Sequence, residues 1–578
     1  MGFSLIRHGA ASTGKRIVID TATSSGDIVA PTVARHEALQ TWLMVSGVFV
    51  GVSLLSVPIP GVNEPHYLSK ARSFADSEWC RNDFFLQSAD AHAVFFAVVG
   101  PATKILSSTA TILIGRILSL MLLAWGWKML GQQLQLPKYQ IVMAACGFCL
   151  IGMTGNFSGE WVIGGFESKV PAYGCALTAV AFWLKAWCSQ KKRTYAVAGI
   201  MAGLAVSWHP VVGLWFCIGI AATELILAFP GAASGAQDSD FTMTLTDRLR
   251  NLIMNGITFV VVSICFAVPG LIPALRVVMA SDLSREELSQ ADYIQVFWRL
   301  AHHLDPSSFP VQAWIHSAIL SGICVGGLVW LAFRNLRTPT VGRSAWWPLI
   351  GLLAAAAITA AAGVMIGWHD GKAVDMPNWQ LRAFLLKFYP FRFFDALLPV
   401  TTALLAAKLL AKHIAERIHR MAVCVLVIAT LTAAHQQQPQ APSAYTSGTY
   451  AAWMEACVWL KHNTPPDSLI YGPRESFGLK LFAERAEYVC FKDCPQDAAG
   501  ILEWNRRLWR VHHWSAAAYA DQVYQDSDLA TLREKTGVTH VLTKRLGPFT
   551  AKPVWQNSVW RIYETNSSPD GKEPGRLN

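Results

Sequence analysis

The chain has 578 residues, of which 53% are hydrophobic and only 15% are charged, and its mean hydropathy is +0.32. Average soluble domains carry about 25% charged residues, so the composition excludes an ordinary soluble enzyme. Much of the formal net charge of +10 lies in short segments between apolar runs. Membrane topology explains that placement better than nucleic-acid binding does. The sequence therefore predicts a multi-pass α-helical membrane protein.

Eleven apolar runs predict transmembrane helices, because about 18 such residues cross a bilayer as a helix. Residues 1–36 are polar and show no cleavable signal peptide, so we expect the first run to be an uncleaved anchor. Residues 91–106 are apolar but interrupted by Gly100 and Pro101, and we expect an interfacial helix there. The eleven runs lie at about 39–58, 109–130, 139–155, 171–188, 195–208, 211–229, 252–275, 312–333, 346–367, 394–411 and 421–434.

Basic and acidic loops alternate between these runs, and this alternation sets the orientation. With a cytoplasmic N-terminus, the basic segments fall inside and the loops rich in carboxylates fall outside. Merging the fifth and sixth runs into one kinked helix would break the alternation. The segments predicted to be inside are 191–193, 248–250, 334–343 and 412–420, and those predicted to be outside are 59–92, 156–170, 276–311, 368–393 and everything after about 434.

From about residue 450 the composition becomes that of a soluble protein. Helical spacing alternates with short strand-like runs, which predicts a small α/β domain outside the cytoplasm. Cys490 and Cys494 lie in this part, and the sequence leaves open whether they form a disulfide. The predicted divisions are a cytoplasmic tail over 1–36, a transmembrane part over 37–435 with its first outside loop at 59–92, a linker over 436–449, a soluble domain over 450–565 and a disordered tail over 566–578.

The first outside loop places several carboxylates beside a membrane, among them Glu64, Asp83 and Asp90. Such groups are costly near hydrocarbon unless they face water or a site. A solvated loop and an active-site loop both remain open. Asp83 and Asp90 are seven residues apart, so on a helix they would share one face. Each is also a favoured helix cap, which would be a purely structural role.

Two further candidates lie near the predicted outer ends of other runs. Lys169 begins the fourth run beside Glu167, where it either pairs with this carboxylate or contacts a phosphate. His209 stands between two short runs that leave room for a cavity. A structural role at a helix that starts with Pro210 explains the histidine as well.

Three cations surround an aromatic-rich segment before the tenth run: Arg382, Lys387 and Arg392. Cations at an interface bind anionic head groups, and the fork of arginine suits phosphate. These residues predict a lipid-phosphate site. Snorkelling of long side chains to the interface accounts for the cluster equally well.

The arrangement resembles the GT-C superfamily of integral-membrane glycosyltransferases. The shared features are an acidic first outside loop, an interfacial helix, many spans and a soluble C-terminal domain. Several strings are also similar to an uncharacterised bacterial family of multi-pass membrane proteins, and the resemblance covers about 37–565. The strings are NEPHY at 63–67, SADAH at 88–92, FESK at 166–169, YPFRFFD at 389–395 and NTPPDS at 463–468.

The resemblance implies transfer of a sugar from a polyprenyl-phosphate-linked donor to an acceptor at the outer face of a bacterial plasma membrane. An acidic residue of the first outside loop is the base or a metal ligand in GT-C enzymes, and here that role falls on Asp83 or Asp90. The loop lacks a clear Asp-X-Asp pair. The sequence therefore leaves open which residue is the base and whether a divalent metal is a cofactor. The expected substrate-binding residues are Glu64, His92, Glu167, Lys169, His209, Arg382, Lys387 and Arg392.

Glycosyl transfer needs a base for the acceptor hydroxyl and positive charge for the departing phosphate. We therefore predict that Asp83, Asp90, Glu167 and Arg392 line one cavity open to the outer leaflet, within about 15 Å of one another. The sequence leaves two other functional classes open. A secondary transporter favours internal repeats and ionisable groups deep in the bilayer, whereas this sequence shows no repeat and places most of its charge in the outside loops. A non-catalytic scaffold would bind a partner through its outside domain.

Overall fold

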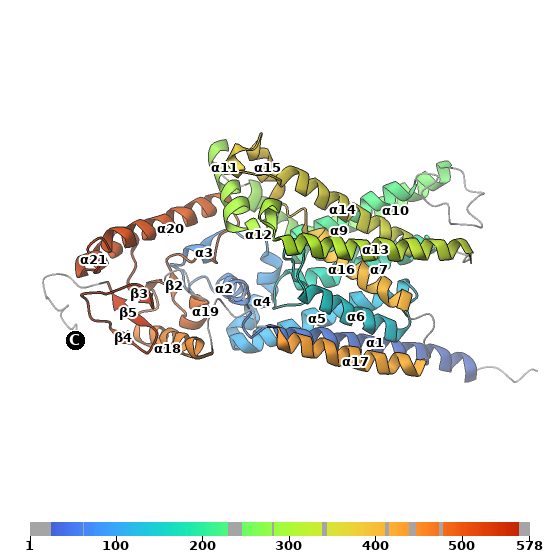
Figure 1. The fold of residues 1–578 in the computed structure, drawn as a ribbon, viewed down its shortest axis with the longest axis horizontal. Helices are drawn as coiled ribbons and strands as arrows, with labels where there is room; N and C mark the ends of the chain where they lie inside the picture. The colour runs from blue at the N-terminus through green and yellow to red at the C-terminus, as the bar shows by residue number, and fades with distance from the viewer. Residues whose placement is uncertain are drawn as a thin grey trace, which may run out of the picture.

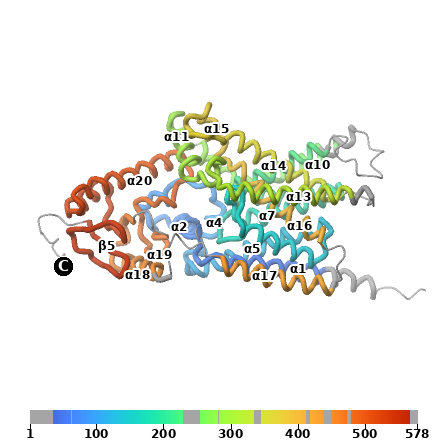
Figure 2. Tube along the Cα trace, in the orientation of Figure 1, coloured from blue at the N-terminus to red at the C-terminus, as the bar shows by residue number. Residues whose placement is uncertain are grey.

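The computed structural model is elongated, with a bundle of long helices at one end and a smaller C-terminal segment at the other (Figure 1). The tube in Figure 2 follows the chain from α1 in the bundle to the C-terminal segment at the opposite end. The structure describes residues 25–61, 63–228, 245–279, 282–337, 344–410, 416–437, 447–472 and 478–565.

Each predicted apolar run coincides with a helix of the bundle. Within the described residues, eight helices are long and apolar enough to cross a membrane, which confirms the multi-pass membrane architecture. Of the other three, α6 and α8 have only 16 and 17 residues, and α7, with 21 residues, is not among the eight. The count of eleven spans therefore stays a prediction. The bundle helices are α1 (Ser25–Ser56), α5 (Ser108–Gln133), α6 (Lys138–Met153), α7 (Lys169–Ser189), α8 (Lys192–Trp208), α9 (Pro210–Ala228), α10 (Leu245–Met279), α13 (Val311–Arg337), α14 (Trp346–Gly367), α16 (Arg392–Leu410) and α17 (Glu416–Gln436).

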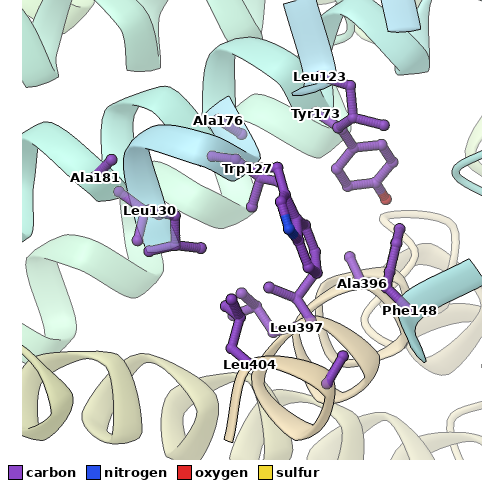
Figure 3. Close-up of a cluster of buried hydrophobic side chains, with 14 of the residues drawn as sticks. Leu123, Trp127, Leu130, Phe148, Tyr173, Ala176, Ala181, Ala396, Leu397 and Leu404 are labelled. Carbon is purple, nitrogen blue, oxygen red and sulfur yellow. The ribbon is translucent and has the colours of Figure 1, made fainter. Parts of the chain in front are cut away.

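Helix α16 lies at the centre of the bundle. In its apolar span 72% of the residues are buried, compared with 17% in α13. Figure 3 shows the indole of Trp127 lying among Leu397, Phe148 and Tyr173, which come from α16, α6 and α7. The rings of Trp127 and Phe148 pack 5.1 Å apart. This apolar core fixes the position of the first turn of α16, which contains Arg392.

Small residues let α8 and α10 approach closely. A β-carbon on Gly199 would lie 2.7 Å from the backbone oxygen of Phe259, and one on Gly203 would overlap the backbone oxygen of Ser263. The four-residue spacing of these glycines is typical of tightly packed membrane helices. The close crossing fixes the end of α8 and therefore the position of His209, which follows it.

Short helices cover the end of the bundle that faces the C-terminal segment (Figure 1). The apolar segment predicted at 91–106 forms one of them, a helix of 13 residues. A β-carbon on Gly100 would lie 2.6 Å from the backbone oxygen of Ala71, so this helix packs tightly on its neighbour. The covering elements are α2 (Glu64–Ala75), α3 (Phe84–Gln87), α4 (Ala93–Ile105), α11 (Arg285–Tyr293), η2 (Ile294–Arg299), α12 (Ala301–Leu304), η3 (Pro306–Ser308), η4 (Ala373–Asp375) and α15 (Trp379–Leu386).

The C-terminal segment, residues 447–565, folds into a five-stranded sheet with helices. The strand order is β2-β1-β3-β5-β4, in which the first three strands run parallel and the last two pair antiparallel. Val541 of β3 pairs with Tyr563 of β5. The elements are α18 (Ser447–Asn463), β1 (Leu469–Tyr471), α19 (Leu479–Ala483), β2 (Ala486–Glu487), α20 (Ala498–Ala518), α21 (Asp526–Thr536), β3 (His540–Thr543), β4 (Trp555–Gln556) and β5 (Arg561–Glu564).

Short strands alternate with helices in this segment, with β2 ending at Glu487 and β4 spanning only Trp555–Gln556. That the segment is a separate domain outside the cytoplasm stays a prediction. Cys490 and Cys494 are free thiols. Most of the predicted linker and the predicted tail over 566–578 lie outside the described residues.

The C-terminal segment is docked by polar contacts on the loops at this end of the bundle. Asn82 donates to the backbone oxygen of Asp467 (2.9 Å), and the ring of His66 lies 3.0 Å from Asp493. Helix η2 also takes part, because Arg299 donates to a backbone oxygen of the segment at 2.8 Å. The contacts bring the loops predicted to lie outside together at one end of the bundle.

Which side of the membrane this end faces stays a prediction, and reporter fusions test it. Fusions at the basic segments are expected to report cytoplasm, and those at the loops near the C-terminal segment are expected to report the outside, because short basic loops are retained inside. Opposite results for Lys192 and Lys412 would contradict the eleven-span topology. The fusion points are Lys192, Arg337 and Lys412 for the inside, and Ser88, Asp370 and Asp497 for the outside.

Candidate functional site

Glu64 forms a buried ion pair with Arg116 of α5. Its Oε1 lies 2.6 Å from Nε and its Oε2 lies 2.7 Å from Nη2 of the guanidinium. The backbone N–H groups of Gly61 and Phe166 donate to the same carboxylate, and Arg116 donates to the carbonyl of Val57 (2.8 Å). Protein donors therefore occupy both oxygens. Glu64, which was expected to bind substrate, instead fastens the first loop to the bundle.

Asp83 is fully buried and joins the first loop to the C-terminal segment. Its Oδ1 caps α3 by accepting from the N–H of Leu86 (3.0 Å), and its Oδ2 accepts from the N–H of Glu487 (2.9 Å). Lys480 lies 3.5 Å from the same carboxylate. Burial raises the pKa of Asp83 despite Lys480. The helix-cap role, which the sequence left open, is present through Oδ1. The contacts of Oδ2 with Glu487 and Lys480 belong to the docking interface.

Glu487, Cys490 and Asp493 form the single group of three metal-ligating residues found among the described residues, with ligand atoms within 4.8 Å of one another. The ammonium of Lys480 lies 2.9 Å from Glu487 and 2.6 Å from Asp493, so it already neutralises these carboxylates. Burial raises the pKa of the Cys490 thiol to about 12, whereas a thiol must lose its proton to bind a metal. The group fits a buried lysine and not a metal ion.

Asp90 and His92 form a buried pair at the start of α4. Asp90 Oδ1 accepts from the backbone N–H of His92 (2.9 Å) and lies 2.8 Å from Nδ1 of its ring. Burial acts to raise the pKa of Asp90, but His92 and Lys70 outweigh it and lower the pKa to about 2. The carboxylate is therefore ionised near neutral pH. Its contact assigns the ring proton to Nδ1 and leaves Nε2 as an acceptor.

His209 connects this pair to Arg392. The rings of His92 and His209 lie 4.8 Å apart, and Arg392 Nη1 lies 3.3 Å from His209 Nε2. Burial, together with His92 and Arg392, holds the pKa of His209 well below its usual value, so the ring is neutral. The guanidinium of Arg392 also lies 4.1 Å from the ring centre of Tyr389.

Two carboxylates and one lysine complete the group around Arg392. Arg392 Nε lies 2.8 Å from Glu160 Oε2, and Lys169 Nζ lies 3.3 Å from Glu167 and 3.7 Å from Glu160. Burial acts to raise the pKa of Glu160, but Arg392 and Lys169 lower it overall. We call Asp90, His92, Glu160, Glu167, Lys169, His209 and Arg392 the polar cluster.

Asp395 holds the loop that carries Glu160. Its carboxylate accepts from the backbone N–H of Phe157 (2.7 Å), the backbone N–H of Ser158 (2.7 Å) and the hydroxyl of Ser158 (2.6 Å). The structure shows that Asp395 supports Arg392 only indirectly, by fixing the loop from which Glu160 reaches the guanidinium.

Arg382 and Lys387 do not join Arg392. Arg382 donates to the backbone oxygen of Ile366 (3.0 Å), and Lys387 pairs with Asp292 of α11 (2.8 Å). The three cations are neighbours in sequence, but a turn at Tyr389, which has a positive φ of 55°, separates α15 from α16. Of the cations predicted to bind a lipid phosphate, only Arg392 belongs to the polar cluster.

The sequence analysis missed two cations, Arg299 of η2 and Lys492 of the C-terminal segment. Arg299 donates to the backbone oxygen of Lys492 (2.8 Å). Burial and the charge of Arg299 lower the pKa of Lys492, while the negative charge of Glu167 raises it. No sequence motif marks either residue. Arg299 lies in η2 and Lys492 follows β2, and only the fold brings these two distant segments together.

Comparison with known proteins gives a partial family match and a set of similar structures. Residues 451–511 match a domain of unknown function (DUF6798). No curated protein matches the chain.

The similar solved structures include three membrane-protein chains. The archaeal oligosaccharyltransferase AglB from Archaeoglobus fulgidus, in complex with an inhibitory peptide and a dolichol-phosphate, is 13% identical with a TM-score of 0.47, covering 88% of this chain and 70% of that chain. ArnT from Cupriavidus metallidurans is 13% identical with a TM-score of 0.41, covering 95% and 100%. The mycobacterial arabinofuranosyltransferase AftD is 12% identical with a TM-score of 0.45, covering 95% and 42%.

Proposed function

We propose that this chain is a membrane glycosyltransferase of the GT-C type, which moves a sugar from a polyprenyl-phosphate-linked donor to an acceptor at the outer face of the membrane. The observation that carries the proposal is the connection from Asp90 through His92 and His209 to Arg392. It joins an oriented base to a cation in one buried cluster at the end of the bundle. Transfer from a lipid phosphate needs this combination.

In the proposed reaction, an acceptor hydroxyl attacks the anomeric carbon of the donor sugar. A bond forms between this carbon and the acceptor oxygen, and the bond between the carbon and the phosphate oxygen breaks. The departing polyprenyl phosphate keeps the electron pair. The acceptor proton passes to Nε2 of His92, whose Nδ1 is held by Asp90 at 2.8 Å. A carboxylate behind the imidazole orients the ring and stabilises the imidazolium that forms.

Arg392 and Lys169 supply the positive charge for the phosphate. The guanidinium presents several N–H groups in a fixed fork, which suits phosphate oxygens. Glu160 contacts both cations, so it positions them. A transporter would favour ionisable groups in mid-membrane. In this chain Lys169 and Arg392 stand at the first residues of α7 and α16, which favours chemistry at the depth of a lipid head group.

Donor hydrolysis tests the proposal without knowledge of the acceptor, because water can replace the acceptor hydroxyl. The purified full-length protein is incubated in lipid vesicles with undecaprenyl-phosphate-linked glucose, mannose, galactose and arabinose, and release of undecaprenyl phosphate is measured. We expect release from at least one donor. Arg392→Lys keeps the charge but loses the fork, and it is expected to lower the rate by about 10²-fold.

Arg382→Lys is the matched control, because Arg382 contacts the backbone of Ile366 outside the polar cluster. It is expected to leave the rate within about twofold of the original, as exposed or remote substitutions do. The absence of release from every donor, or an equal loss in the two variants, would contradict the proposed function.

A further inference from the structure

A pocket of about 310 Å³ lies where the C-terminal segment meets η2. It is distinct from the polar cluster and shares none of its residues. Its walls come from η2, the end of β1, the loop after β2, and α20. The residues that carry the argument are Trp298, Tyr471, Phe491, Trp509, His512 and Ser515.

The walls of the pocket combine aromatic side chains with the aliphatic Val489, Leu508 and Val511, and carry no Lys, Arg, Asp or Glu side chain. The indoles of Trp298 and Trp509 are 44% and 51% exposed. Large aromatic side chains usually bury most of their surface, so two exposed indoles around one hollow point to a ligand. The absence of charge in the walls argues against a phosphate or a charged peptide.

Neighbouring rings fix the planes of both indoles. Trp509 stacks on His513 with ring centres 5.5 Å apart and an angle of 27°. Trp298 packs edge-on against Phe491 at 5.8 Å and tilted against Trp504 at 5.3 Å. A pocket whose aromatic faces are already oriented loses little conformational entropy when a ligand binds.

An uncharged sugar ring has the chemistry that this pocket accepts. One face of a pyranose or furanose ring carries C–H groups, which pack on the electron-rich face of an indole. Its edge carries hydroxyls, which need polar partners. His512 supplies ring nitrogens and Tyr471 supplies a phenol. An isoprenoid chain would not use this polar rim.

Phe491 connects the pocket to two neighbouring cations, Arg299 and Lys492. The guanidinium of Arg299 lies 5.2 Å from the centre of the Phe491 ring, and Arg299 contacts Lys492. We propose that this pocket is a subsite for one ring of an uncharged oligosaccharide. The subsite would hold a remote ring of the acceptor or donor during transfer, and this role rests on the proposed function. Binding of the saccharide does not depend on the proposed function.

Calorimetric titration of the purified full-length protein tests the subsite. The probes are maltotriose, cellotriose, mannotriose, galactotriose and an arabinose trisaccharide. We expect at least one to bind, and Trp509→Ala to weaken that binding by at least tenfold, because the stacking face is removed. Trp509 is half exposed, so the variant is expected to fold.

Tyr519→Ala is the matched control, because Tyr519 follows the same helix, is 45% exposed and does not line the pocket. It is expected to leave the dissociation constant unchanged. The proposal is overturned by no binding of any trisaccharide, by binding that survives Trp509→Ala, or by a pocket that takes farnesol in preference to sugars. Saccharide binding without donor hydrolysis would retain the subsite and reject only the proposed function.

Discussion

Asp90→Asn is expected to lower the rate of sugar transfer by about 10²–10⁴-fold, the usual contribution of a general base. The substitution removes the charge that lies 2.8 Å from Nδ1 of His92. An amide at this position no longer fixes the tautomer with a free Nε2 and no longer stabilises the imidazolium. The initial rate of undecaprenyl phosphate release, measured on protein that elutes as a single species, is the readout.

Asp83→Asn is the control for this prediction. Asp83 was a candidate for the base, but its carboxylate caps α3 and meets the C-terminal segment. The variant is expected to weaken docking and to keep most of the rate per folded molecule. If folded Asp83→Asn loses transfer and Asp90→Asn retains it, Asp83 serves the reaction and the pair of Asp90 and His92 does not.

Lys480→Met is expected to destabilise the docked C-terminal segment by about 3–5 kcal/mol, the usual cost of removing one partner from a buried ionic group. Lys480 is 3% exposed and contacts Asp83, Glu487 and Asp493, which are also largely buried. Methionine fills the space but leaves three carboxylates without their cation. The expected result is a lower apparent melting temperature and faster proteolytic separation of the C-terminal segment from the bundle.

Lys461→Met provides the comparison on the same segment. Lys461 pairs with Glu484 at 2.7 Å, but the two side chains are 39% and 43% exposed. Water screens such a pair, and its loss is expected to cost at most about 1 kcal/mol. Equal effects of the two substitutions would show that the group around Lys480 does not hold the segment in place.

The sequence by itself determined the membrane architecture, because span length and apolar composition are local properties. A helix stands at each of the eleven apolar runs. The alternation of helices and strands after residue 450 was also readable locally, and so was the end of α21 at Gly537, whose φ is +75°. These features depend on periodicity and on single residues that stop a helix.

Only the tertiary structure decided what each charged residue does. Glu64, Asp83 and Asp90 look alike in the sequence, as acids in one loop. They differ because their partners come from other segments: Arg116 of α5 for Glu64, Glu487 and Lys480 for Asp83, and His92 with the nearby Lys70 for Asp90.

The same reasoning separates the cations. Arg392 meets Glu160, which lies 232 positions away in the chain, whereas Lys387 meets Asp292 on another outer helix. The free energy of a buried charge depends on its neighbours in space, because electrostatic interactions are strong in the low dielectric of the protein interior. Whether a side chain is charged there therefore depends on its partners more than on its residue type. Local patterns carry no information about such distant partners, so the sequence could propose the charged residues and only the fold could assign them.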